Sequence, residues 1–290
     1  MQNNIPKIGF GTWPLKGRIM EEVMKKAIDV GYRMFDTADN YGNEDTIGNV
    51  IAQGYIKREE LKIVTKISDE KSLDNRWSSV GKYFYKTSPY MQQHSCKEVV
   101  NMLVENSLRK LRTDYIDCLI IHWPYPDYLL EIWETMMSLQ KDGKLLSIGV
   151  SNCQIRHLEK IYKAFGVYPS VNQVSISPVN TKSDLIEYCN KNGITAMCYA
   201  PLQQAQAVER KNPELLKELC EKYSKSIQEL LLMWNCTQNI IPIPKSTNKE
   251  RMKANFAVQD IKLSDEDLAK LNSLDEGIQY LPESMFCPGL

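Results

Sequence analysis

Eight short apolar segments recur along the chain, and longer amphipathic segments separate them. This alternation is the strongest constraint on the fold, because each apolar segment has the length of a single strand. Nearly continuous apolar character is typical of strands that are buried on both faces of a parallel sheet. The predicted strands lie within residues 7–13, 32–38, 61–67, 116–124, 145–152, 169–175, 194–202 and 239–246.

The segments between these strands have the periodicity of helices. Apolar residues repeat at helical spacing from Met20 to Ala27 and again from Val100 to Leu111. Gly31 follows the first of these helices, where a glycine commonly caps a helix end. The chain therefore alternates between strand and helix throughout its length.

Eight strand–helix units in series predict an α/β fold, namely a (β/α)8 TIM barrel that forms a single domain over residues 1–290. A doubly wound open sheet is the alternative. It normally has fewer strands in a domain, and the chain shows no linker at which it would divide. Residues 68–95 form an insertion in the third βα loop, which is far longer than the usual loop of about 2–6 residues.

Charge and composition exclude several classes of partner. The 36 basic and 36 acidic residues give a formal net charge of zero, so we expect neither nucleic acid nor membrane as a partner. No apolar segment approaches the length of about 20 residues that spans a bilayer, and the first residues lack the pattern of a signal peptide. The eight cysteines include no CxxC pair and are predicted to be reduced thiols of a cytoplasmic protein.

Polar residues that can carry chemistry stand at the ends of the predicted strands. In barrels of this kind the active site lies at the carboxyl ends of the strands, so these side chains are expected to converge. Asp36 ends the second segment, and Tyr41 follows it by five positions. Lys66 and His122 end the third and fourth segments. A buried Lys66 would need a partner, and Asp36 on the neighbouring strand is the candidate.

Each of these four residues also has a purely structural interpretation. A single Asp at a strand end commonly caps a helix or forms a turn. A lone Lys is usually solvated, a His within an apolar segment is commonly a satisfied core residue, and a Tyr often only packs. The joint occurrence of all four at barrel positions that face one mouth favours a functional site.

Several short motifs occur in a fixed order over about residues 5–260. Together they resemble the aldo-keto reductase family, in its NADPH-dependent bacterial form with a short loop after the fourth strand. The motifs are GFGTW, FDTADNYGNE, IVTKI, LIIHWP, IGVSN, VNQ, YAPL and IPIPKSTNKERMKANF.

The resemblance implies that Asp36, Tyr41, Lys66 and His122 form a catalytic tetrad. Reduction of an aldehyde or ketone to an alcohol requires a hydride on carbon and a proton on oxygen. Tyr41 would donate the proton, with a pKa lowered by the charge of Lys66. Asp36 would keep Lys66 charged, and His122 would orient the carbonyl oxygen by a hydrogen bond.

The resemblance also implies NADPH/NADP+ as the cofactor, lying across the barrel mouth. Ser151, Asn152 and Gln173 would bind its carboxamide, and Tyr199 would stack on the nicotinamide ring. A Rossmann phosphate loop is not favoured, because Gly9 and Gly11 lack a third glycine. The implied cofactor-binding residues are Thr12, Trp13, Ser151, Asn152, Gln173, Tyr199, Pro201, Leu202, Lys245, Ser246, Asn248, Arg251 and Asn255.

Two cations near the start of the last predicted helix bear on the choice between NADPH and NADH. Lys245 and Arg251, together with Ser246 and Asn248, suit a phosphate, because backbone N–H groups at a helix start also attract anions. This favours NADPH through its 2′-phosphate. An ordinary capped helix with solvated charges is the alternative.

The substrate side is where the chain departs from the family. The resemblance implies that Trp13, Tyr41, His122 and Trp123 line the substrate site. The aromatic-rich insertion over residues 68–95 either replaces the short fourth-strand loop as a substrate wall or forms a peripheral cap or oligomer contact.

Two other classes of function are alternatives to a carbonyl reductase. A non-catalytic or weakly catalytic NADP(H)-binding partner protein on the same fold is the alternative, since a fold does not determine a function. A metal-dependent hydrolase is disfavoured, because the chain has only three histidines and no HxH motif, so no metal site is expected. We expect a small carbonyl substrate and a monomer or weak homo-oligomer.

Overall fold

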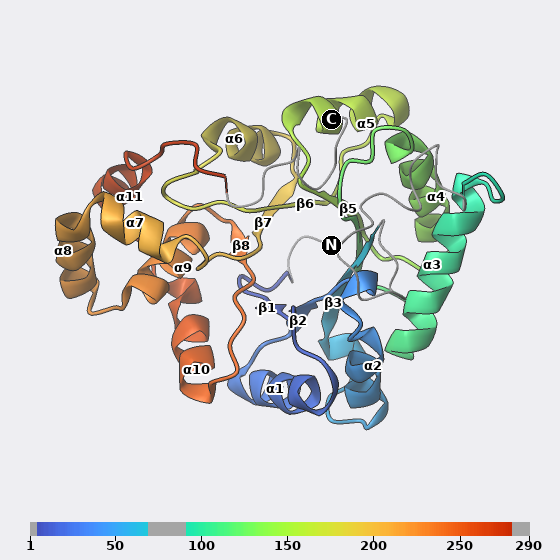
Figure 1. The fold of residues 1–290 in the computed structure, drawn as a ribbon, viewed down its shortest axis with the longest axis horizontal. Helices are drawn as coiled ribbons and strands as arrows, with labels where there is room; N and C mark the ends of the chain where they lie inside the picture. Colours follow the sequence, from blue (N-terminus) through green and yellow to red (C-terminus); the bar gives the residue numbers. More distant parts are fainter. Residues whose placement is uncertain (1–4, 69–90, 280–290) are drawn as a thin grey trace.

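A computed structural model describes residues 5–68 and 91–279 of the chain. Its central element is an eight-stranded parallel sheet in which the strands follow one another in chain order (Figure 1). The strands are β1 (Phe10–Gly11), β2 (Met34–Asp36), β3 (Lys62–Ile67), β4 (Cys118–Ile121), β5 (Ile148–Ser151), β6 (Val171–Val174), β7 (Thr195–Cys198) and β8 (Ile241–Pro242).

Backbone hydrogen bonds join the first and last strand segments and close the sheet. The Gly9 amide donates to the Pro242 carbonyl at 3.0 Å, and the Gly11 amide donates to the Pro244 carbonyl at 3.1 Å. A Cβ atom on Gly11 would lie only 2.8 Å from the Ile243 carbonyl oxygen, so the close approach of the two segments requires a glycine at this position. The predicted (β/α)8 barrel is thus confirmed, and the open-sheet alternative is wrong.

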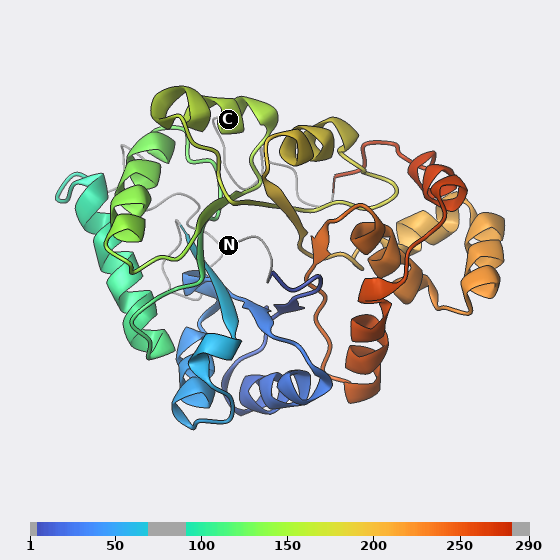
Figure 2. The same ribbon diagram turned by 180° about the vertical axis from the view of Figure 1, so that it is seen from behind.

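Helices surround the strands on the outside (Figures 1 and 2). Three of them, α7, α8 and α11, lie together at one side of the molecule in both views. The α-helices are α1 (Gly17–Val30), α2 (Glu44–Ala52), α3 (Cys96–Leu111), α4 (Leu129–Lys141), α5 (Ile155–Phe165), α6 (Ser183–Lys191), α7 (Ala205–Lys211), α8 (Pro213–Tyr223), α9 (Ile227–Thr237), α10 (Lys249–Ala257) and α11 (Asp265–Asn272). Short 3-10 helices are η2 (Asp39–Tyr41), η3 (Arg58–Glu60) and η4 (Val258–Asp260).

Local sequence explains where these helices begin and end. In α1 the predicted apolar face is buried, and Gly31 ends the helix with a φ of 121°, a value that favours glycine. Helix α3 begins with a capping box, because Ser95 accepts from the Glu98 amide while the Glu98 side chain accepts from Ser95. The helix predictions from apolar spacing are therefore confirmed.

Three further expectations concern the cysteines, membrane-spanning helices and the long insertion. The seven cysteines within the described ranges are free, and six of them are buried. Within residues 5–68 and 91–279, no helix combines the length and the apolarity needed to cross a bilayer. Most of the 68–95 insertion, including Trp77, Tyr83, Phe84, Tyr85 and Tyr90, lies outside the described residues.

Candidate active site

Alternation along the strands brings the predicted site residues into one layer. Apolar side chains fill the barrel interior, and every second residue of a strand faces the same side. Asp36 follows the interior residue Met34 by two positions, and Lys66 follows Val64 in the same way. The same step leads from Ile120 to His122, from Val171 to Gln173 and from Met197 to Tyr199. The polar layer therefore lies directly on the apolar core at the carboxyl ends of the strands.

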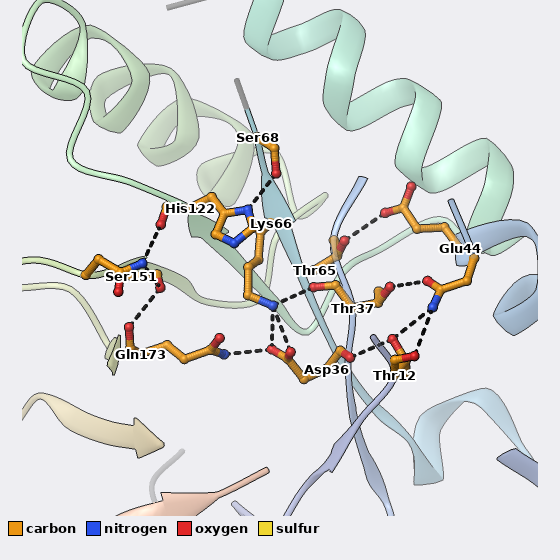
Figure 3. A network of polar contacts seen from close by, with 12 residues as sticks. Thr12, Asp36, Thr37, Glu44, Thr65, Lys66, Ser68, His122, Ser151 and Gln173 are labelled. Atoms are coloured by element: carbon orange, nitrogen blue, oxygen red, sulfur yellow. Dashed lines mark hydrogen bonds and ion pairs between the residues drawn. The ribbon is translucent and has the colours of Figure 1, made fainter. Parts of the chain in front are cut away.

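Lys66 and Asp36 form a buried ion pair at the centre of this layer (Figure 3). The Lys66 Nζ atom lies 2.9 and 2.7 Å from the two carboxylate oxygens of Asp36 and donates to the Thr37 carbonyl at 2.7 Å. Gln173 donates from Nε2 to Asp36 Oδ1 at 2.6 Å. Burial lowers the pKa of Lys66, but the neighbouring Asp36 and Tyr41 outweigh that effect and raise it overall, so the ammonium stays charged.

Tyr41 lies beside this ammonium at the end of the 3-10 turn η2. Its ring centroid is 5.0 Å from Lys66 Nζ, and the His122 ring lies edge-on to it at 6.1 Å. Burial raises the pKa of Tyr41 above its ordinary value, although the charge of Lys66 acts to lower it. The sequence predicted the direction of the lysine effect, but the expected net lowering of the pKa is wrong, because loss of hydration is the larger effect.

His122 follows strand β4 and is electrically neutral. Burial, and next the charge of Lys66, lower its pKa to about 3. The Nδ1 atom lies 2.7 Å from the Ser68 hydroxyl, and the backbone carbonyl of His122 accepts from Asn152 Nδ2 at 3.1 Å. A neutral imidazole has one N–H group, so it can donate a hydrogen bond from only one of its two nitrogens.

The residues expected at the nicotinamide carboxamide form a connected hydrogen-bond chain. The Asn152 side-chain amide donates to the Ser151 hydroxyl at 3.1 Å. The Ser151 hydroxyl in turn donates to the backbone carbonyl of Gln173 at 2.8 Å. Tyr199 donates to Asn152 Oδ1 at 2.9 Å. Asn152 has a φ of 59°, in the left-handed region that asparagine tolerates. The structure thus brings these four residues together next to His122.

The residues expected at the 2′-phosphate form a second group at the start of α10. Asn248 caps this helix by accepting from the Arg251 amide at 3.0 Å, and the Asn248 amide donates to the Ser246 hydroxyl at 3.1 Å. Lys245 and Arg251 are exposed, whereas Asn255 is buried. No ion pair involves Lys245 or Arg251 within the described parts of the chain. Exposed cations beside a helix start match the donor set of a phosphate site.

The remaining predicted residues differ in exposure. Thr12 is buried and donates to the Asp36 carbonyl at 2.9 Å, whereas 53% of the Trp13 surface is exposed. Trp123 is half-buried, with its ring stacked near His122 at a centroid distance of 6.5 Å. Further along the mouth, the structure places Pro201 in a buried turn and packs Leu202 against the main core.

Besides Thr37, which accepts from Lys66, four residues that contact this layer were not singled out from the sequence. Asn43 donates to Thr12 Oγ1 at 3.1 Å, and Glu44 accepts from the Thr65 hydroxyl at 2.7 Å (Figure 3). The other two are Asp39, in η2, and Ser68, directly after β3. Asp39, Asn43 and Glu44 lie within or beside the same motif as Tyr41, and that position was the available signal.

Comparisons with known proteins indicate one family. The family model of the Aldo/keto reductase family matches residues 7–276. A glyoxal reductase of Bacillus subtilis (strain 168) is 34% identical over 284 residues, covering 97% of this chain and 94% of the relative. A methylglyoxal reductase of Escherichia coli (strain K12) is 30% identical over 283 residues, covering 97% of this chain and 94% of the relative.

Solved structures agree over nearly the whole chain. An aldo-keto reductase from a Medee basin deep-sea metagenome library has a TM-score of 0.81 at 31% identity, covering 96% of this chain and 94% of its own. A Bombyx mori aldo-keto reductase in complex with NADP has a TM-score of 0.81 at 29% identity, covering 98% of this chain and 94% of its own.

The barrel fold and the match to the family define a barrel enzyme of the oxidoreductase class. The chain belongs to the aldo/keto reductase family. Aldo-keto reductases use NADP(H), and the resemblance drawn from the sequence motifs and the cofactor it implied are both confirmed at the level of the family.

Proposed function

We propose that this protein reduces an aldehyde or ketone to an alcohol, with NADPH as the hydride donor and Tyr41 as the proton donor. The observation that carries the proposal is the buried Lys66–Asp36 ion pair next to the Tyr41 ring. A charged ammonium held beside a phenol at a barrel mouth can stabilise the phenolate that remains when the phenol gives up its proton.

The raised pKa of Tyr41 suits the direction of the reaction. A proton donor must carry its proton at working pH, and burial keeps the phenol of Tyr41 protonated. As the proton moves to the carbonyl oxygen, negative charge appears on the phenol oxygen close to Lys66, whose charge Asp36 maintains. The lysine thus stabilises charge that develops only during the transfer.

Neutral His122 would orient the carbonyl oxygen of the substrate. Its ring lies edge-on to Tyr41, so an oxygen between them can accept hydrogen bonds from both. This role requires a hydrogen on Nε2, because Nδ1 faces the Ser68 hydroxyl.

The chain's residues fit NADPH at two places. Ser151, Asn152 and Gln173 supply amide and hydroxyl groups for a carboxamide, and the exposed Lys245 and Arg251 supply cations for a phosphate. When bound, the cofactor supplies the hydride that reduces the carbonyl carbon.

We propose small dicarbonyl compounds as the first substrates to examine. Two of the relatives are named a glyoxal reductase and a methylglyoxal reductase. Trp123 beside His122 and the exposed Trp13 would form part of the substrate wall. We further propose that residues 1–290 form a single barrel domain, which acts as a monomer or weak homo-oligomer.

The test replaces Tyr41 by Phe and follows the loss of NADPH absorbance with glyoxal, methylglyoxal and simple aldehydes. We expect kcat/KM to fall by about 10²–10⁴-fold, with NADPH affinity unchanged, because only the proton donor is lost. Tyr55→Phe is the matched control, since within residues 5–68 and 91–279 the Tyr55 hydroxyl bonds only to the surface residue Asp29.

Two outcomes would count against the proposal. Near wild-type turnover by the Tyr41→Phe variant would exclude Tyr41 as the proton donor. Tight NADPH binding by the wild-type protein without turnover of any carbonyl in the panel would favour the non-catalytic cofactor-binding alternative.

A further inference from the structure

A buried polar chain leads from His122 away from the proposed substrate side. The His122 Nδ1 atom lies 2.7 Å from the Ser68 hydroxyl oxygen. The Ser68 amide donates to Asp39 Oδ2 at 3.2 Å, and the Ser68 hydroxyl also stabilises the charged form of the Asp39 carboxyl. Ser68, directly after β3, thus connects the Asp39 carboxyl on η2 to the His122 imidazole after β4.

Asp39 is a carboxyl group in a dry environment. Only 2% of its surface is exposed, and its Oδ1 atom has no hydrogen-bond partner within the described part of the chain. The gap beside it is lined mainly by apolar residues, among them Ile67, Leu103 and Leu119. Burial raises the pKa of this carboxyl to about 8, and the nearby Glu44 adds to the rise. Asp39 therefore carries its proton at neutral pH.

The other charged groups around Asp39 do not reverse this state. Glu44 of α2 faces it and disfavours a second negative charge, and Tyr41 of the same turn is protonated. Lys66 of β3 lines the same gap but is engaged in its own ion pair. The Lys110 Nζ atom of α3 lies 3.9 Å from Glu44 Oε2 rather than beside Asp39.

The hydroxyl of Ser68 has one hydrogen and two possible acceptors. When Asp39 is protonated, it can donate to the Ser68 oxygen, and the Ser68 hydrogen is then free to bond His122 Nδ1. The single hydrogen of the neutral imidazole must in that case lie on Nε2. When Asp39 is charged, it attracts the Ser68 hydrogen, so the Ser68 lone pairs face Nδ1 and favour a hydrogen there instead.

We propose that Asp39 is a positioning residue which, acting through Ser68, keeps the hydrogen of neutral His122 on Nε2. Loss of the Asp39 proton to solvent turns the Ser68 hydroxyl toward Asp39. The imidazole then releases its Nε2 hydrogen to solvent and takes one up at Nδ1, so its net charge is unchanged. The catalytic consequence rests on the proposed function, in which Nε2–H orients the carbonyl oxygen of the substrate.

The first experiment observes the tautomer directly, by ¹⁵N NMR of the ¹⁵N-histidine-labelled full-length protein between pH 6 and 9.5. The chain has only three histidines, so His94→Gln and His157→Gln variants assign the His122 signals. We expect the Nε2–H tautomer at pH 6 and a change to Nδ1–H with a midpoint near 8, the pKa of Asp39. The Nδ1–H tautomer at pH 6, or one unchanging tautomer across the range, would overturn the proposal.

The same titration in Tyr41→Phe separates this inference from the proposed function. The tautomer change does not require turnover, so it is expected to persist in that variant even if the assignment of Tyr41 is wrong. Its loss in Tyr41→Phe, with the fold intact, would mean that Tyr41 and not Asp39 controls the imidazole.

The second experiment measures kcat/KM against pH in Asp39→Asn. The asparagine side chain imitates the protonated carboxyl, because it cannot become charged and carries a hydrogen-bond donor beside the oxygen that accepts from the Ser68 amide. In the wild type we expect kcat/KM to fall by up to about tenfold per pH unit above the transition. In Asp39→Asn that fall and the NMR transition should both disappear, with kcat/KM at pH 7 within about threefold of wild type.

Two variants complete the set. Ser68→Ala removes the connecting hydroxyl, so the wild-type transition should disappear and kcat/KM at pH 7 should fall, with folding verified by circular dichroism. Asp45→Asn removes an exposed carboxylate of the neighbouring helix α2 and should keep the wild-type profile. Persistence of the transition in Asp39→Asn, or its loss in Asp45→Asn, would refute the role of Asp39.

Discussion

Lys66 shows how a single residue joins the stability of the molecule to its chemistry. It is among the largest fully buried side chains, and its charge is balanced by Asp36 on the adjacent strand. Burying both groups costs hydration, which the pair recovers only through close contacts such as those to Thr37 and Gln173. We interpret the pair as a functional arrangement, since an apolar pair of similar volume would fill the same space without the cost.

Replacing Lys66 by Met should therefore destabilise the protein, because it leaves the Asp36 carboxylate buried without its cation. We expect the free energy of unfolding to fall by about 3–5 kcal/mol in urea denaturation. Lys7→Met is the control, since the Lys7–Asp260 pair is 66% and 71% exposed. That change should cost less than about 1 kcal/mol. Equal effects of the two substitutions would contradict a desolvated ion pair at the barrel mouth.

The sequence predicted which residues meet at the mouth better than it predicted how they interact. Asp36 and Lys66 could be paired in advance, because polar residues at the ends of adjacent parallel strands must lie close together. Ser68 could not be placed against His122, because that contact depends on the direction of the chain after β3. The raised pKa of Tyr41 also depends on burial, which a sequence motif does not report.

At the scale of elements, the contact between helices α2 and α3 depends on a missing side chain. A Cβ atom on Gly48 of α2 would lie 2.1 Å from the Lys110 carbonyl oxygen of α3. The glycine permits this approach, which also brings Glu44 of α2 close to Lys110. Apolar spacing predicted that a helix forms in this part of the barrel, but the spacing of residues along one helix does not reveal how close a second helix comes.

Gly48→Ala should consequently destabilise the protein, although alanine is the better helix former by up to about 1 kcal/mol. Overpacking against a backbone carbonyl should cost about 1–3 kcal/mol, so the net change in thermal denaturation should be a loss. Ala52→Ser, at an exposed position of the same helix, is the control and should change stability by no more than about 0.5 kcal/mol. A stabilised Gly48→Ala variant would show that the two helices can separate at no cost.

At the scale of the whole molecule, the alternation of apolar and amphipathic segments was sufficient to predict the barrel. Each of the eight predicted segments contains one strand, and the strand order follows the chain order. The closure between β1 and β8 was less evident, since each of these strands has only two residues and their junction depends on Gly11. The extra helices α7 and α8 were not anticipated, because an apolar face on a helix does not specify its place around a barrel.

Cofactor binding should stabilise this whole barrel, because the two predicted contact groups lie on different strand–helix units. At 100 times its dissociation constant, NADP+ should add about 2.7 kcal/mol, a rise in Tm of roughly 5 °C by calorimetry. Arg251→Ala should reduce the shift caused by NADP+ and leave the shift caused by NAD+ unchanged, since only NADP+ carries the 2′-phosphate. Lys253→Ala, which removes an exposed cation of the same helix, should leave both shifts unchanged. An equal loss of both shifts in Arg251→Ala would instead place the arginine at a group that the two cofactors share.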